Sequence, residues 1–423
     1  MHKPWTIGVL AVFALLLGGC GGGNGDNNNT NGIKAFVSIN NVGPGTNFSF
    51  DISGVDSAKG RMYFTDRNNK SVDVIDVRTN ALLKQITGGF AGCDTGPTCA
   101  GANNAKSGPD GLNIIPGTTL IYVGDVNSVK IIDSQTDSVV RTIAIGGHSG
   151  LRADEGCYDP DHKIFMISSP EESTPFATFI DTTSQQIIAT ILFTDPGSGP
   201  AGPAAAGLEA CVYDRASASF LVNNDGSTAN PHGELDVIPA SFVLVGTPAA
   251  PATLTLPVPT AANGFKIFPL GNCDPTGIDL GPGTDVAVSC RQGTANVPLT
   301  VQILDRTNGT VRANLNAGGG DQITYDPSSN RYYLAASRWT KSGLSSGAAC
   351  TAASLCTPVL ITIDAASRTV VSMRPSGNNA HSVGVDPATG QIYMPYSSAT
   401  APAGCDPDTC GAVPNGGVLV YGV

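Results

Sequence analysis

The sequence is poor in charged residues, and basic residues are the rarer kind. Charged side chains make up 13% of the 423 residues, and 23 lysines and arginines against 34 aspartates and glutamates give a net charge of −11. The chain has no run of lysine or arginine. Nucleic acids and anionic membrane surfaces attract proteins through cationic patches, so we expect neither to be a partner of the folded domain.

Helical periodicity is also missing. After residue 32 no segment keeps apolar residues at the i, i+3, i+4, i+7 spacing of an amphipathic helix. Collagen is excluded because no Gly-X-Y period occurs, and a hydrophobic content of 41% argues against a disordered chain. What is abundant is turn residues, with 52 glycines and 29 prolines between short segments rich in Val, Ile, Tyr and Thr. This composition predicts an all-β fold.

The N-terminus has the pattern of an export signal. Lys3 precedes an apolar segment over residues 7–17, which is too short for a bilayer span of about 20 residues. The following Leu17-Gly18-Gly19-Cys20 resembles a bacterial lipobox, which implies that residues 1–19 are a signal peptide and that Cys20 is lipidated. An ordinary secreted protein with a chance cysteine is the alternative.

Residues 20–32 (CGGGNGDNNNTNG) then predict the lipidated cysteine and a flexible tether. We therefore expect a protein of the bacterial cell envelope that is held at the membrane by its lipid anchor only. Gly21 after the cysteine favours the outer membrane by analogy with enteric lipoproteins.

A unit of four short strands recurs seven times over residues 33–423. Each copy has an apolar strand, a turn that usually begins with Asp, a strand with Tyr or Phe, and two further strands, as in SFDISGVDSAKGRMYFTD and VDVIDVRTNALLKQI. The seventh copy has only three strands, so we expect residues 33–40 (IKAFVSIN) to supply its outer strand. The prediction is a seven-bladed β-propeller with four antiparallel strands per blade, closed by the N-terminal strand.

The repeated unit resembles the YVTN-type β-propeller repeat. The Asp-turn-Tyr segments and the Ile-Asp-turn segments carry this resemblance, which extends over nearly all of residues 33–423. The fourth copy departs from it, because Pro239 stands where the other copies have Asp. The bacterial members of this family are exported proteins of mixed function, so the resemblance implies a fold and an exported location but no particular activity.

Ten cysteines follow Cys20, and an even number in an oxidising compartment predicts disulfides. Three pairs are local in sequence: Cys93 with Cys99, Cys350 with Cys356, and Cys405 with Cys410. Cys273 and Cys290 face each other if Asp279 pairs with Asp285 across their hairpin, and Cys157 and Cys211 fall on neighbouring innermost strands. No motif for c-type haem or for a nucleotide occurs, so we expect neither cofactor.

The long connections of the propeller share one face. They are expected at residues 88–109, 194–207, 223–233, 338–358 and 397–416, and all three local cysteine pairs lie in them. Loops of this kind carry binding residues in many folds, so we expect a protein or small-molecule ligand on this face. His148 and Arg152 lie where they could overhang the end of the central channel.

One aligned position is acidic in six of the seven copies. It lies five residues before the first turn of each unit, at the start of the innermost strand and at the mouth of the channel. Its residues are Asp51, Asp110, Asp154, Glu209, Asp274, Asp321 and His381. Six clustered carboxylates repel one another, so a bound cation, protonation or backbone N–H donors must offset their charge.

Three interpretations of this ring stay open. The carboxylates could cap backbone amides of adjacent blades, they could bind a cation, most simply Ca²⁺, or they could form a catalytic mouth in which Glu209 or His381 acts as general base beside a metal. The sequence thus favours a membrane-anchored binding or scaffold module. A metal-dependent, lactonase-like hydrolase or a lyase is the alternative.

Overall fold

The computed structural model describes most of the chain after the N-terminal region. The described residues are 32–145, 150–193, 207–347, 350, 354–398, 404–410, 413 and 415–422. The chain divides into residues 1–30 and 31–423, and the fold below is that of the second unit. The expected signal peptide, Cys20, most of the tether and His148 lie outside the described residues.

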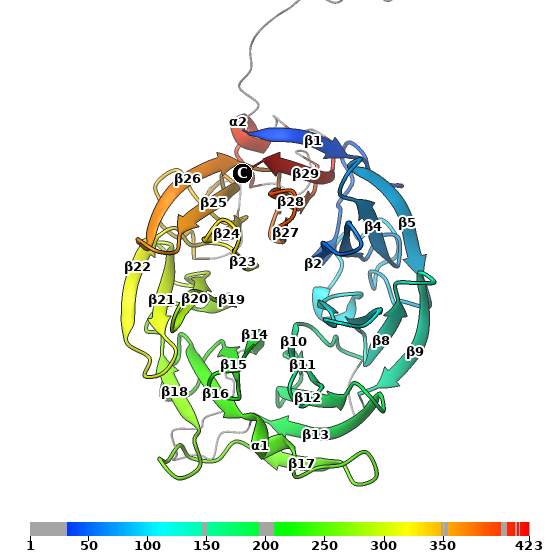
Figure 1. Cartoon of the computed structure of the whole chain (residues 1–423). Coiled ribbons are helices and arrows are strands. Elements are labelled where there is room, and N and C mark those ends of the chain that lie inside the picture. Colours follow the sequence, from blue (N-terminus) through cyan, green and yellow to red (C-terminus); the bar gives the residue numbers. More distant parts are fainter. Residues whose placement is uncertain are drawn as a thin grey trace, which may run out of the picture. The chain divides into compact units, whose positions relative to one another are not determined.

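Seven β-sheets are arranged as blades around a central channel (Figure 1). The first three blades contain β2 (Phe50–Asp56), β3 (Arg61–Asp66), β4 (Ser71–Asp76) and β5 (Ala81–Thr87); β6 (Leu112–Ile114), β7 (Leu120–Asp125), β8 (Ser128–Asp133) and β9 (Ser138–Ala144); β10 (Gly156–Asp159), β11 (Ile164–Ser169), β12 (Phe176–Asp181) and β13 (Gln186–Leu192). In each blade the first strand is innermost, and consecutive strands pair antiparallel.

The other four blades repeat this order. They contain β14 (Leu208–Asp214), β15 (Ser219–Asn224), β16 (Glu234–Pro239) and β18 (Lys266–Pro269); β19 (Pro275–Leu280), β20 (Asp285–Cys290), β21 (Thr300–Asp305) and β22 (Val311–Asn316); β23 (Ile323–Asp326), β24 (Arg331–Ala336), β25 (Val359–Asp364) and β26 (Thr369–Pro375); β27 (Gly384–Asp386), β28 (Gln391–Tyr396), β29 (Gly417–Gly422) and β1 (Ile33–Val37). The predicted seven-bladed architecture is confirmed.

The burial of the strands explains why the sequence reads as short apolar runs. Every residue of the middle strand β4 is buried, since both faces of the sheet pack against neighbouring blades. In the outer strand β5, by contrast, all residues are exposed or half-buried except Ile86. Large side chains such as Tyr63 and Phe64 fill the space between blades with no exposure, and each contributes roughly 1.5–3 kcal/mol to folding.

The N-terminal strand closes the ring as predicted. β1 pairs antiparallel with β29, with Phe36 opposite Leu419 and Val37 opposite Val418. Figure 1 shows this pairing of the first strand, in blue, with the last, in red. Because β1 comes from the start of the chain and the other three strands of this blade come from its end, the pairing closes the ring and completes the seventh blade.

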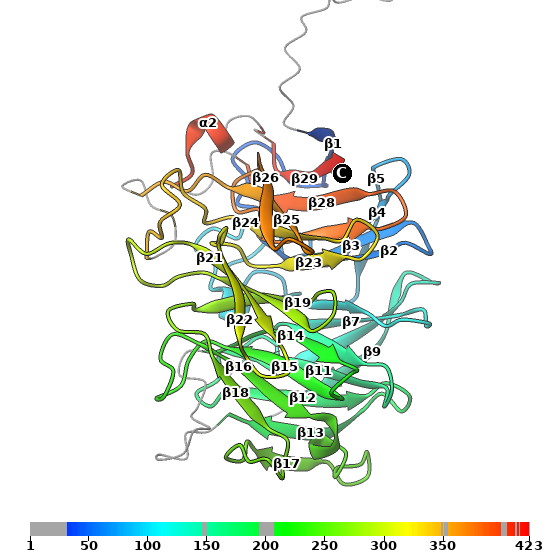
Figure 2. The same ribbon diagram turned by 60° about the vertical axis from the view of Figure 1, so that its left-hand side comes forward.

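The degenerate fourth blade contains an insertion. Pro239 ends β16, and the chain continues through α1 (Ala240–Val243) and β17 (Ala252–Thr255) before β18 completes the blade. β17 pairs in parallel with β13, which gives the third blade a fifth strand on its outside (Figure 2). The other helical segments are η1 (Asn104–Lys106) and α2 (Pro407–Cys410). None of the helices in the described residues has the length and apolar character of a membrane span.

All five predicted disulfides form. The Cys157–Cys211 bond joins β10 to β14 across two blades, and the three local pairs lie in long loops. The Cys273–Cys290 bond also forms, but the register expected for its hairpin is wrong by two residues. Asp279 pairs with Ala287, and the ladder is irregular between Pro275 and Ile278. This irregularity brings Cys273 within 4.6 Å (Cα–Cα) of Cys290.

Candidate functional site

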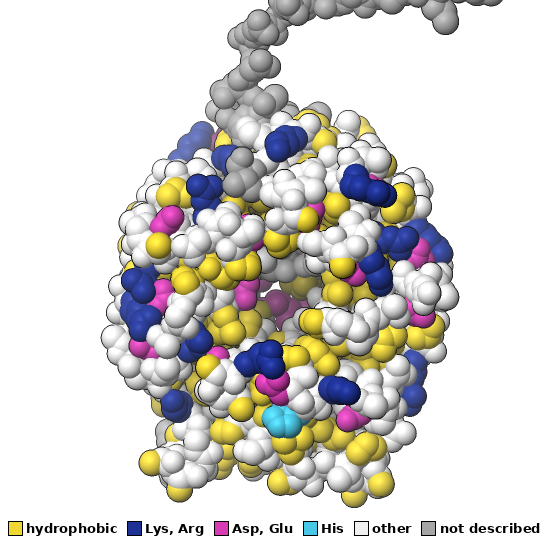
Figure 3. Space-filling view, viewed as in Figure 1, with side chains coloured by type: hydrophobic (Ala, Val, Ile, Leu, Met, Phe, Trp, Pro, Cys, Tyr) yellow, Lys and Arg dark blue, Asp and Glu magenta, His cyan; other side chains and the backbone are white. Residues whose placement is uncertain are grey.

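The central channel holds two cavities. One, of about 470 Å³, lies where the innermost strands begin, and residues of the long loop 88–109 also line it. We call it the mouth cavity. The other, of about 300 Å³, lies along the innermost strands, and Glu155 lines both. Figure 3 shows the channel opening at the centre of the ring, with acidic side chains inside it.

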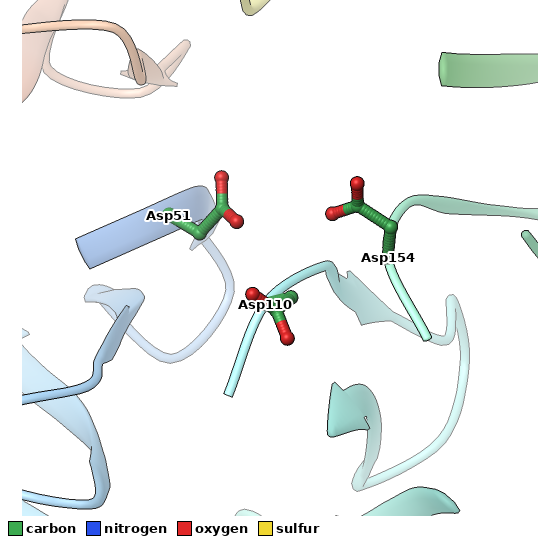
Figure 4. A group of neighbouring side chains, drawn as sticks. All are labelled: Asp51, Asp110 and Asp154. Carbon is green, nitrogen blue, oxygen red and sulfur yellow. The ribbon is translucent and has the colours of Figure 1, made fainter. Parts of the chain in front are cut away.

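Three of the seven predicted residues form a compact set, which we call the aspartate group. Asp51, Asp110 and Asp154 come from three consecutive blades and offer carboxylate oxygens within 4.8 Å of one another (Figure 4). Their exposed fractions are 6%, 0% and 4%. Three buried carboxylates at this spacing require positive charge or protons.

Two arginines supply that charge. The guanidinium of Arg67 donates hydrogen bonds to both Asp51 and Asp110. Arg152, which was expected near the mouth, places Nη2 2.7 Å from Asp154 and Nη1 3.6 Å from Asp51. The carboxylates of the aspartate group, which lie close enough together to hold a metal ion, are thus already joined to two guanidiniums in an ion-pair network.

The pKa values reflect this network. Burial acts to raise the pKa of Asp51, but Arg67 and His381 outweigh it and hold that pKa well below its usual value. Burial raises the pKa of Asp154 to about 7, in spite of Arg152. The buried Asp110 carboxyl also has a raised pKa. One member of the group is therefore firmly charged, and the other two hold protons more readily.

His381 belongs to the same network. Its ring stacks on Phe50 with the centroids 4.5 Å apart, and Nδ1 lies 2.7 Å from the carbonyl oxygen of Asn379. Nε2 lies 3.7 Å from Oδ1 of Asp51. Burial acts against the charged imidazolium, but Asp51 raises the pKa of His381 overall. The histidine is therefore held as a partner of Asp51.

A second set, the inner carboxylate group, lies beside the first. Glu155, Glu209 and Asp321 offer oxygens within 4.8 Å of one another, and all three line the mouth cavity. Glu155 was not among the predicted residues, because it lies one residue further along its strand than the aligned position. Burial, followed by neighbouring acids, raises the pKa of both Glu155 and Glu209 well above the usual value.

This second group has less positive charge than the first. Arg291 lies 3.4 Å from Glu209 and 3.0 Å from Asp225. Among the described residues, neither Glu155 nor Asp321 has an ion pair, and Oδ1 of Asp321 is buried without a hydrogen-bond donor. An acidic group with this geometry could hold a metal ion.

The seventh predicted residue lies apart. Asp274 is not among the residues that line the mouth cavity. Its carboxylate accepts a hydrogen bond from the backbone N–H of Gly293 and lies 3.6 Å from Nδ1 of His232. This is the amide-capping arrangement considered from the sequence, here made within one blade.

A second position of charged residues at the mouth was not identified from the sequence. Arg67, Asp225 and Arg291 each follow directly after the second strand of their blade, and all three take part in ion pairs at the mouth. Aligning the repeats on the end of the second strand, as well as on the first turn, would have identified this position.

Fold and site together define a seven-bladed β-propeller protein with a charged channel mouth. No family model matches the chain, and no curated protein does. Among solved structures, the chain is similar to a Kuenenia stuttgartiensis hydrazine synthase, with 13% identity over 85% of this chain and 94% of that one and a TM-score of 0.57. A mitotic checkpoint complex chain has 9% identity over 99% and 100%, also with a TM-score of 0.57. At these identities the likeness shows the propeller fold alone.

Proposed function

We propose that this chain is an exported, lipid-anchored β-propeller that acts as a binding module and takes a small ligand at its mouth together with a Ca²⁺ ion. One observation carries the proposal: Glu155, Glu209 and Asp321 converge in a cavity of about 470 Å³ without enough positive charge around them. Cavities of this volume are typical of small-molecule sites.

Calcium suits the inner carboxylate group chemically. Ca²⁺ binds six to eight oxygen ligands at about 2.3–2.6 Å, so two of its ligands are at most about 5 Å apart. Oxygens within 4.8 Å of one another meet this condition. The set holds no nitrogen or sulfur donor, which favours a hard cation over zinc or copper. Three carboxylates leave coordination positions for water or ligand oxygens.

The expected location is the outer membrane of a bacterial cell envelope. The lipobox-like Leu17–Cys20 segment supports the anchor, and the five disulfides support an oxidising compartment. The catalytic alternative receives less support. His381 is engaged with Asp51 and Glu209 with Arg291, so neither residue considered as a general base is free in the described mouth.

Calcium titration of the full-length protein, purified in detergent, tests the proposal. Ca²⁺ should raise the melting temperature, because a hundredfold excess over Kd stabilises the native state by about 2.7 kcal/mol. Glu155→Gln with Asp321→Asn should remove this response. Asp274→Asn is the matched control, since it changes an acid outside the cavity, and should respond like the wild type. A wild-type protein that ignores Ca²⁺ would refute the cation site.

A further inference from the structure

We infer that the ligand of the mouth carries a carboxylate or another oxyanion, which binds Arg338 and the calcium ion together, so that oxyanion binding depends on calcium. This inference rests on the proposed function and deepens it. It is carried by the side chain of Arg338, by its neighbour Ser337 and by the charge balance of the mouth cavity.

Arg338 is the unpaired arginine of this cavity. The other three arginines that line it, Arg67, Arg152 and Arg291, each bind carboxylates. The guanidinium of Arg338 makes no hydrogen bond or ion pair with any described residue, although it is half-buried. A guanidinium withdrawn from water in this way gains most from an oxyanion partner, whose two oxygens match its planar donors.

The backbone holds Arg338 in this place. Its N–H donates a hydrogen bond of 2.8 Å to the carbonyl of Gly319. Gly319 has a φ of +77°, and a Cβ there would lie 3.0 Å from the carbonyl carbon of Arg338. Only glycine combines this conformation with so close an approach. The strand end and the following loop therefore present Arg338 from a fixed position.

Ser337 gives a second, independent indication of a polar ligand. It lines the same cavity, is 8% exposed, and its hydroxyl makes no hydrogen bond with the described residues. A hydroxyl that has no partner among the described residues and belongs to a residue lining a cavity can donate a hydrogen bond to a ligand there. Ser337 and Arg338 together form a donor pair on one side of the mouth.

The carboxylates of the mouth lie near Arg338 and carry the opposite charge, but they do not contact it. Burial and the charge of Arg291 disfavour the charged guanidinium of Arg338, and the charges of Asp321, Glu209 and Asp225 favour it, without any of these acids forming an ion pair with it. The gap between the guanidinium and the inner carboxylate group therefore exceeds contact distance. A cation bound by the carboxylates, followed by an oxyanion bound by Arg338, places alternating charges across it.

The charge balance explains why the oxyanion should need calcium. Apart from His381, six carboxylates and four guanidiniums line the described cavity: Asp51, Asp154, Glu155, Glu171, Glu209 and Asp321 against Arg67, Arg152, Arg291 and Arg338. The acids therefore outnumber the guanidiniums, and carboxylates in their ionised form repel an anion. A bound Ca²⁺ offsets their negative charge and offers open coordination positions to the oxyanion. By linkage, the oxyanion must in turn strengthen calcium binding.

Isothermal titration of the full-length protein in detergent tests the inference. The probes are glutarate and methylphosphonate, each titrated in about 10 mM Ca²⁺, roughly tenfold above the Kd of the weakest extracellular sites, and in EDTA. We expect binding in calcium only, and the tighter probe identifies the ligand as a carboxylate or a phosphate-type anion. Arg338→Gln should weaken probe binding at least about tenfold, about 1.4 kcal/mol, with the affinity for Ca²⁺ alone unchanged.

Three further variants serve as controls. Glu155→Gln should lose calcium and probe binding together. Arg215→Gln, which removes an arginine that is 69% exposed and lies outside the cavity, should behave like the wild type. If Arg338→Gln fails to fold, Arg338→Lys replaces it, since it keeps the charge but loses the planar donors and should still weaken probe binding.

The outcomes separate the two proposals. Calcium binding without any calcium-dependent probe binding, or probe binding that Arg338→Gln leaves intact, overturns the inference and leaves the proposed function standing. No calcium binding overturns both. Probe binding in EDTA that is as tight as in calcium would overturn the inference, because the oxyanion would then not depend on calcium.

Discussion

Nη1 of Arg291 lies 3.4 Å from Oε1 of Glu209, and this contact joins the fifth blade to the fourth at the channel mouth. The same guanidinium binds Asp225, at 3.0 Å. Arg67 forms an equivalent connection between the first and second blades through Asp51 and Asp110. The acids of the mouth therefore differ in their partners: Asp51, Asp110 and Glu209 are tied to arginines that connect blades, whereas Glu155 and Asp321 form no ion pair with the described residues.

Removing Arg67 should destabilise the ring strongly. Arg67→Gln leaves Asp51 and Asp110 buried without their shared cation, and breaking a buried ion pair costs about 3–5 kcal/mol. Urea denaturation monitored by circular dichroism measures the loss. Arg78→Gln is the control, because Arg78 is 78% exposed and its pair with Asp76 should contribute less than about 1 kcal/mol. Equal losses for both variants would contradict the ion-pair account of the mouth.

The Cys157–Cys211 disulfide, which joins blades three and four, should stabilise the folded protein more than a disulfide within one loop. Cys157 and Cys211 are separated by 54 positions, whereas Cys93 and Cys99 are separated by 6. The chain-entropy model assigns about 4 kcal/mol to the long closure and about 2 kcal/mol to the short one. Paired Cys→Ser changes, compared by thermal unfolding, test this order. A larger loss from the local pair would show that strain or loop contacts dominate.

A buried pair of acids in the first blade should make stability depend on pH. Asp66 and Asp73 lie on the adjacent strands β3 and β4 with no exposure. Burial raises the pKa of Asp66 to about 6 and also raises that of Asp73, whose charge Asp66 further disfavours. A carboxyl with a higher pKa in the folded state binds more protons there, so the free energy of unfolding falls as the pH rises from about 4.

Asp73→Asn tests this pair. The amide replaces one titrating group and donates to Asp66, so the variant should gain stability over the wild type as the pH rises, by on the order of 1–3 kcal/mol at pH 8. At about pH 3, below the unfolded pKa of about 3.9, both carboxyls are mostly protonated in either state, and the two proteins should unfold alike. Melting temperatures measured between about pH 3 and 8 test this difference. A gain in stability that does not vary with pH would show that Asp73→Asn acts through packing and not through the loss of a titrating group.

The lipid anchor gives a prediction in cells. Cys20→Ala should move the protein from the membrane fraction to the soluble fraction, because the acceptor thiol of the lipobox-like segment is lost. The melting temperature of the purified protein should not change, since the substitution precedes the propeller in the sequence. Fractionation followed by immunoblotting measures the shift. Wild-type protein found in the soluble fraction after export would show that the segment is not a lipobox.

Much of the fold could be predicted because its causes are local. Alternating strands, turn residues and the repeated Asp at the first turn recur with each blade, so seven blades followed from counting copies. The closure by residues 33–37 followed from the missing fourth strand of the last copy, and Phe36 opposite Leu419 confirms it. The insertion around β17 could not be predicted, because its parallel pairing with β13 depends on contacts across two blades.

The sequence by itself determined that acids recur at the start of the innermost strands, since a fixed repeat places equivalent residues at equivalent depths. Only the tertiary structure decided how they are grouped. Ion pairing depends on distances of a few ångströms between blades, which no repeat length specifies. The fold places Arg67 between Asp51 and Asp110, turns Asp274 toward the amide of Gly293, and brings Glu155 beside Glu209 and Asp321.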